Sequence, residues 1–225
     1  MGEDHSSQLG DFIKGRLIFI EHYCKENNID YKKAMEQIED EAIKRAGSKE
    51  NEEFLKTRLF GGLVLPTSIL PNWLDKVFLE AMSYVLKGPH TPLFTTTSKI
   101  SCIPFEAGRF NARRQADTIF QILFQNKTPN EWLKTSFPLL YRKCYGDEAG
   151  NKLKIIEHSK THFEIITDNT NLEKASRIDC STVVGYLYGA LEKLNAKNIV
   201  VTHEKCLAEM PVSQKLCSFD ITFEF

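Results

Sequence analysis

The sequence lacks any long apolar run and any excess of charge of one sign. Its 225 residues carry 29 lysines and arginines against 30 aspartates and glutamates, which gives a formal net charge of −1. A nucleic-acid-binding surface normally has a basic excess, so this balance argues against such a partner. No apolar stretch approaches the roughly 20 residues of a membrane span, and the N-terminal MGEDHSSQLGDF is polar and acidic rather than a signal peptide. We therefore expect a cytoplasmic protein.

Familiar motifs of enzyme chemistry are also missing. The sequence has no glycine-rich phosphate loop, no nucleophile elbow and no serine–histidine–aspartate order, and no pair of carboxylates interrupts an apolar run. Because no catalytic residues can be identified from the sequence, a non-enzymatic role is favoured but not decided. The six cysteines, with no secretory signal, are interpreted as reduced thiols or metal ligands rather than as a disulfide set.

Hydrophobic periodicity predicts a helical region followed by a mixed one. Residues 1–90 read as an N-terminal helical region packed on the core, because apolar residues recur there at helical spacing. Residues 91–225 read as helix, helix, hairpin, helix, strand and strand. This order predicts an α+β fold, with an antiparallel sheet of about four strands packed on helices and a metal site near the C-terminus.

Within the first region, Asp30 is expected to cap a helix whose Ala34, Ile38 and Ala42 form an apolar stripe. Residues 88–98 are expected to be a loop, GDEAGN a turn, and Asp179 the start of the last helix.

The stretch VTHEKCLAEMPVSQKLC places three potential metal ligands within two strands. His203 and Cys217 share the inward side of consecutive strands by the two-residue period, and Cys206 lies just past the first strand. The nine residues between the strands predict an antiparallel hairpin that brings these side chains together. A fourth ligand is available in Cys180, at the start of the preceding helix, where the helix N-terminus favours a thiolate.

A set of three cysteines and one histidine is typical of a closed, structural zinc site. We therefore predict structural zinc at Cys180, His203, Cys206 and Cys217. Two alternatives stay open at this point. Glu204 replaces His203 as ligand if the strand register is shifted, or the four residues are an unrelated core histidine and three buried thiols.

The C-terminal stretch DCSTVVGYLYGALEKLNAKNIVVTHEKCLAEMPVSQKLCSFDITF resembles a known pattern. It is similar to the four-vinyl reductase-like ligand-binding domains, in a superfamily with the transport-particle subunits of Golgi traffic and the haem nitric-oxide sensors. The resemblance covers most of residues 14–225. Upstream of the quoted stretch, the sequence is mainly similar to a bacterial family of unknown function. Its specific motif is confined to the last 46 residues.

The resemblance also bears on the metal. In the phenol-sensing bacterial activators of this type, a structural zinc is held by Cys, Glu, Cys and Cys. The first three ligands have the spacing of Cys180, His203 and Cys206 here. This sequence departs by having His203 in place of the glutamate and by placing Cys217 a few residues late.

In such a fold a ligand pocket lies between the helices and the sheet, and ligand pockets are mostly apolar. Aromatic residues supply a candidate lining, with core packing as the alternative for each: Phe105, Phe110, Phe120, Phe124, Trp132, Tyr141 and Tyr186. Haem is not expected, because the Tyr-x-Ser-x-Arg signature of the haem sensors is missing and no histidine except His22 lies in a strongly predicted apolar helix.

Together these observations favour a sensor or carrier module for a small hydrophobic or aromatic ligand. The resemblance implies a homodimer, and a protein effector is a possible further partner. Two other functions remain: a protein–protein assembly scaffold like the transport-particle subunits, and an enzyme acting on a tetrapyrrole. The lack of a redox-cofactor motif counts against the enzyme.

Overall fold

The computed structural model describes residues 7–62, 64–65, 67–168, 176–206 and 216–225. Its elements follow the chain as β1 (Ser7–Leu9), α1 (Gly10–Glu26), α2 (Tyr31–Arg45), α3 (Lys49–Phe54), η1 (Leu55–Phe60), β2 (Ile69–Pro71), α4 (Asn72–Leu86), α5 (Ile103–Asp117), α6 (Gln121–Phe124), α7 (Pro129–Glu131), η2 (Trp132–Ser136), α8 (Phe137–Lys152), β3 (Lys154–Ser159), β4 (His162–Asp168), α9 (Arg177–Lys193), β5 (Lys197–Lys205) and β6 (Leu216–Glu224). The elements η1 and η2 are π-helical.

The main sheet is antiparallel throughout, with strand order β3-β4-β6-β5. Strand β6 is central, and its alternate residues Cys217, Phe219, Ile221 and Phe223 are buried against the helices. β1 and β2 form a separate two-stranded sheet. The predicted α+β class, with a four-stranded antiparallel sheet and N-terminal helices, is confirmed.

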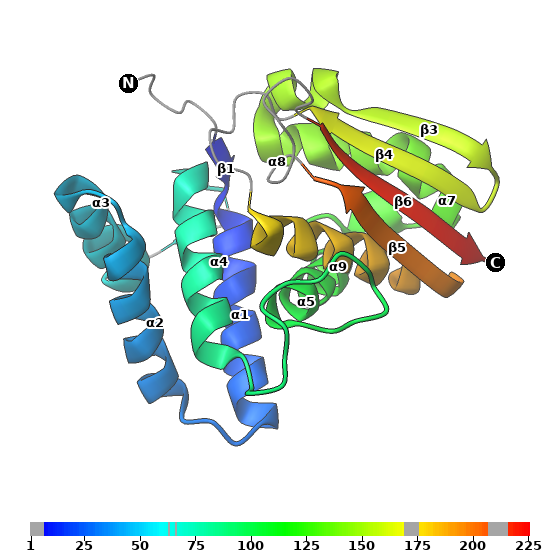
Figure 1. The fold of residues 1–225 in the computed structure, drawn as a ribbon. Coiled ribbons are helices and arrows are strands. Elements are labelled where there is room, and N and C mark those ends of the chain that lie inside the picture. Colours follow the sequence, from blue (N-terminus) through cyan, green and yellow to red (C-terminus); the bar gives the residue numbers. More distant parts are fainter. Residues whose placement is uncertain (1–6, 63, 66, 169–175, 207–215) are drawn as a thin grey trace.

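The helices lie in successive layers beside the sheet (Figure 1). Helix α2 lies outermost, α1 and α4 come next, then α5, and α9 lies against the sheet, with α7 and α8 beside β3 and β4. The expected start of α2 is present, because the Asp30 side chain accepts a hydrogen bond from the Lys33 N–H at 3.0 Å. Its predicted stripe of Ala34, Ile38 and Ala42 is buried.

Helices α5 and α9 approach closely because glycines line their contact. A Cβ atom on Gly185 would stand 1.9 Å from the carbonyl oxygen of Phe105, and one on Gly108 would stand 2.0 Å from that of Thr182. A Cβ on Gly189 would stand 2.5 Å from the Arg109 carbonyl oxygen. Only glycine permits this spacing, which places α9 directly between α5 and the sheet.

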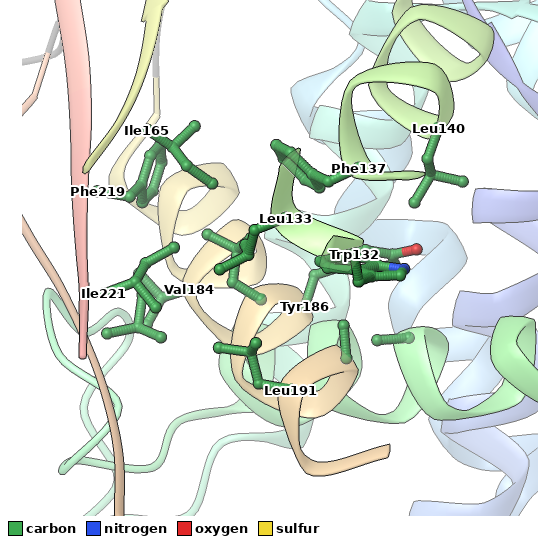
Figure 2. Packing of buried hydrophobic residues seen from close by; sticks show 14 of the residues in the cluster. Trp132, Leu133, Phe137, Leu140, Ile165, Val184, Tyr186, Leu191, Phe219 and Ile221 are labelled. Atoms are coloured by element: carbon green, nitrogen blue, oxygen red, sulfur yellow. The ribbon is translucent and has the colours of Figure 1, made fainter. Parts of the chain in front are cut away.

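Buried side chains form two hydrophobic clusters. One fills the space among α1, α2 and α4, and the other lies between the sheet and helices α5, α8 and α9. Figure 2 shows the second cluster, in which Trp132, Leu133 and Phe137 pack toward Val184 of α9, with Phe219 of β6 on the far side. Helices α5 and α9 contribute residues to both clusters.

Several boundaries differ from the sequence-based expectations. The stretch GDEAGN was expected to be a turn, and its first residue, Gly146, does interrupt α8 with a φ of 86°, but the chain then resumes a helix that ends at Lys152. Helix α9 starts at Arg177 with Ser176 as its cap, two residues before the expected start at Asp179. In the described ranges, no helix is both long and apolar enough to cross a membrane.

Candidate metal centre

Four side chains from three elements converge at one buried point. Cys180 comes from the first turn of α9, His203 from β5, Cys206 from just beyond β5, and Cys217 from the start of β6. Their ligand atoms all lie within 4.8 Å of one another, and all four residues are buried. The structure thus brings together the complete set that the sequence singled out.

A bulge in β5 makes this convergence possible. Thr202 pairs with Asp220 and Lys205 with Ser218, so three steps along β5 match two steps along β6. A regular strand would direct His203 and Cys206, three residues apart, to opposite faces. The extra residue restores both to the inner face, whereas Glu204 stays exposed.

The ring of His203 is oriented for metal binding. Its Nδ1 lies 2.8 Å from the Ser218 carbonyl oxygen, which can only accept, so Nδ1 carries the proton and Nε2 is left free. Nε2 is buried without a hydrogen-bond partner of good geometry and belongs to the face that meets the thiols. The ring also stacks on Phe219, with a centroid distance of 4.3 Å. A buried nitrogen in this position needs a proton or a metal to satisfy it.

The sulfur spacing matches tetrahedral coordination. The Cys180 Sγ lies 3.6 Å from the Cys206 Sγ and 3.9 Å from the Cys217 Sγ. A tetrahedral ion with metal–sulfur bonds of about 2.3 Å holds two sulfurs about 3.8 Å apart. The site therefore needs little rearrangement to accept such an ion.

The four side chains shift one another's proton affinity, as the pKa values of Cys180 and His203 indicate. Hydrogen bonds to the Cys206 and Cys217 sulfurs, together with burial, raise the pKa of Cys180 well above its usual value. Burial alone would lower the pKa of His203, but the neighbouring sulfurs of Cys206 and Cys217 and the Ser218 carbonyl raise it to about 9. A metal ion would displace these protons and take their place as the positive partner of the thiolates.

Most of the aromatic candidates pack in the core between sheet and helices. Phe105, Phe120, Phe124, Trp132 and Tyr186 are buried there, and Tyr141 packs against the same cluster. Phe110 is separate: it lies against the helical cluster, with its ring 5.8 Å from that of Phe19. The structure thus groups six of the seven candidates.

The geometry defines an α+β domain that has helices on one face of an antiparallel sheet and a buried Cys3His cluster. No family model matches the chain, and no curated protein matches it. Solved structures of H-NOX domains share the fold.

A Cs H-NOX mutant carrying 4-cyano-L-phenylalanine aligns with a TM-score of 0.58 at 10% identity, over 96% of this chain and 97% of that one. An Fe(II) unliganded H-NOX mutant from K. algicida gives 0.55 at 14% identity, over 96% and 97%. An oxygen complex of an oxygen-binding H-NOX domain related to soluble guanylate cyclases gives 0.54 at 11% identity, over 96% and 93%. At such identities the likeness concerns the fold.

These structures correct the cofactor prediction, which named structural zinc and excluded haem. Haem distortion and haem redox potential are the subjects of other similar H-NOX structures, so this fold carries haem in those proteins. A missing signature was a poor guide, because a fold is set by many buried residues and a signature by a few site residues. The similar structures therefore do not support zinc as the cofactor of this fold.

The described residues do not supply a histidine ligand for a haem. Haem iron is commonly held by a histidine that faces an apolar space. The side chains of His22, His158 and His162 are 48%, 42% and 40% exposed, His90 is also exposed, and His203 faces the thiols. A hollow of about 300 Å³ on the outer face of the sheet is polar, lined by Glu164, Thr202, Glu204, Lys205, Ser218 and Asp220.

Some residues of the site had no sequence signal. The Ser218 carbonyl that orients His203 is a main-chain group, which any residue would supply. The segment around Thr95 and Thr96, which contacts both Ser181 and His203, was expected to be a loop with no role. The threonine-rich run TTTSK is consistent with side-chain capping of that loop, but it does not indicate where the loop packs.

Proposed function

We propose that the chain is a sensor domain of the H-NOX fold whose Cys180, His203, Cys206 and Cys217 bind a tetrahedral, thiolate-preferring metal ion. The observation that carries this proposal is the buried Nε2 of His203, which has no partner of good geometry and meets three thiols. Three thiols and an imidazole are the ligands that such ions prefer over carboxylate-binding ions.

The ion would act as a brace within the domain. It would join the first turn of α9 to the paired ends of β5 and β6, three segments that are otherwise distant in sequence. All four ligands are buried, which leaves no open position for a substrate, as in structural sites. Sensing would therefore depend on whether the ion is present and on what the braced elements contact.

The test is metal analysis of the whole chain after purification without added metal. We expect about one ion per chain, with its identity given by mass spectrometry. Cys206→Ser should abolish stoichiometric binding, and the melting temperature should fall by about 2–4 °C for each kcal/mol of metal-derived stability that is lost.

Cys24→Ser is the matched control. It makes the same change at a buried thiol of the helical cluster, so it should lower stability without changing metal content. A chain without metal, or a Cys206→Ser chain that keeps it, would refute the proposal. The absorbance spectrum of the same preparation detects any bound haem directly. Haem that co-purifies would be a second group available for sensing.

A second candidate, an apolar ligand among the aromatic residues, is favoured by one observation. The Nε1 of Trp132 is fully buried and has no hydrogen-bond partner, whereas a buried indole N–H normally has one. A small hydrophobic molecule with one acceptor would satisfy it. Native mass spectrometry of the purified chain tests this, and it also reports the proposed homodimer, a protein effector, or the hetero-complexes expected of an assembly scaffold.

A further inference from the structure

The loop between α4 and α5 contains a short segment, residues 95–98, that lies along the open side of β5. We call this segment the strap. Thr97 forms an isolated bridge with Thr202, so the strap extends the sheet by a single pair on the side of β5 opposite β6. The strap is not itself a strand, and its hold on β5 depends on individual hydrogen bonds.

Those hydrogen bonds reach residues at or beside the proposed metal ligands. The His203 N–H donates to the Thr96 carbonyl oxygen at 2.8 Å, and the Thr95 N–H donates to the Ser181 hydroxyl, next to Cys180, also at 2.8 Å. The Ser181 oxygen in turn lies 2.7 Å from the Thr95 carbonyl oxygen. The strap is therefore attached to both strand and helix at the point where the ion would join them.

Two further hydrogen bonds attach the strap to β5 at Val201, next to Thr202. The Ser98 N–H donates to the Val201 carbonyl oxygen at 2.9 Å, and the Val201 N–H donates to the Ser98 hydroxyl at 2.9 Å. This second attachment is separate from the ligands, so it can be weakened without altering the metal site.

A buried thiol lies near the strap. Cys102, the cap residue of α5, follows the strap by four residues, is 1% exposed and belongs to the cluster between sheet and helices. Burial raises the pKa of Cys102 to about 11, although the nearby Ser181 hydroxyl and Thr95 main chain act to lower it, so the thiol is a poor nucleophile. The residues that flank the strap, Phe94 and Ile100, are 41% and 50% exposed, so this part of the loop lies at the surface.

We propose that the metal ion controls the strap: with the ion bound, residues 95–98 stay docked on α9 and β5, and with the ion removed they detach and uncover Cys102. This inference rests on the proposed metal site. Loss of the ion frees Cys180 and His203 to move independently, and the strap bonds to both neighbourhoods at once. The loop that contains the strap joins α4 to α5. Release of the strap would therefore free this loop and couple the presence or absence of the ion to the helical layers.

The experiment is alkylation of the native full-length chain at pH 8, with each cysteine followed by peptide mass spectrometry. Removing the ion with a chelator should raise the alkylation rate of Cys102 at least about tenfold, because lost hydrogen bonds make local opening more frequent. Cys24 is the internal control, since it is 1% exposed but lies in the helical cluster away from the strap. Its rate should not change.

A pair of variants separates the strap from the metal. Ser98→Ala removes one strap bond and should speed Cys102 alkylation with metal content unchanged. Ser101→Ala is the matched control. It removes an exposed hydrogen bond from the Ser101 hydroxyl to Glu106 of α5, which does not involve the strap, so Cys102 should stay protected.

Each outcome decides the question. A chain that binds metal but shows the same Cys102 rate with and without the ion overturns the strap inference alone. A parallel rise at Cys102 and Cys24 also overturns it, since that pattern reports general unfolding. A chain that takes up no metal overturns the proposed function and this inference with it.

Discussion

His203 and Glu204 are neighbours in β5, so the alternation of the strand directs their side chains to opposite faces of the sheet. His203 is fully buried beside the thiols, and Glu204 borders the polar hollow on the outer face. The distinction matters because either residue could ligate a metal by its chemistry alone. Position, rather than ligand chemistry, separates the two.

Matched amide substitutions test this placement. We expect His203→Gln to weaken metal binding more than about 100-fold, since changes even in the shell outside the ligands cost about 10–100-fold. Glu204→Gln should leave affinity within about twofold, as expected for an exposed side chain. Competition with a chromogenic chelator measures both affinities, and weaker binding in the Glu204 variant alone would assign the ligand role to Glu204.

At the scale of elements, helices α5 and α9 pack closely through their glycines. This contact helps to position the candidate site. Cys180 lies on the first turn of α9, and Gly185 and Gly189 follow on the same helix against α5. Any side chain at Gly185 meets main-chain atoms of Phe105, which cannot rotate away as a side-chain tip can. The position of the metal ligand therefore depends on glycines more than a turn away.

Gly185→Ala should destabilise the protein by about 1–3 kcal/mol, the usual cost of overpacking. Gly88→Ala is the control, because a Cβ there meets only the Thr91 hydroxyl at an ordinary 3.4 Å. That change should shift stability by less than about 1 kcal/mol. Denaturant unfolding followed by circular dichroism compares the two, and equal effects would contradict the close approach of α5 and α9.

The same elements indicate what the sequence could and could not predict. Asp30 and the stripe of Ala34, Ile38 and Ala42 specify α2 through local rules, and the alternation in β6 specifies its buried face. The bulge at His203 depends on pairing with β6, a partner that local periodicity does not contain. The stretch GDEAGN was predicted only in part, because the chain leaves the helix at Gly146, as its composition indicates, but forms a further helical turn after it.

The candidate site divides in the same way. The four candidate ligands could be named because thiol and imidazole side chains are chemically distinctive at any position. The strap could not, because its bonds to His203 and Val201 are made mostly by main-chain groups of residues a hundred positions away. Nor could the sequence separate a pocket lining from a packed core, since both use Phe, Trp and Tyr.

Across the whole molecule, each hydrophobic cluster contains one of the two tryptophans. Trp73 packs against the helical cluster, and Trp132 lies fully buried in the cluster beneath the sheet. Because α5 and α9 supply residues to both clusters, we expect the two to unfold together rather than as separate domains at the predicted boundary near residue 90.

Single-tryptophan variants test this coupling. With Trp73→Phe and Trp132→Phe, fluorescence follows each cluster separately during thermal unfolding. In each variant the fluorescence transition should coincide with the loss of circular dichroism, and a chelator should lower the melting temperatures of both variants by a similar amount, because the ion stabilises only the folded state. A chelator that shifts the Trp132 signal alone would show that the helical region is an independent unit.

The order of the ligands along the chain has a consequence for time as well as for stability. The ligand set is complete only when β5 and β6 have paired and α9 has docked on them. An ion held by all four side chains therefore needs a nearly native arrangement, and we expect most of its stabilisation to be absent from the folding transition state. Stabilisation that appears so late slows unfolding and leaves the rate of folding nearly unchanged. The metal would then set how long a folded molecule lasts, and stopped-flow unfolding of the two tryptophan variants measures that lifetime.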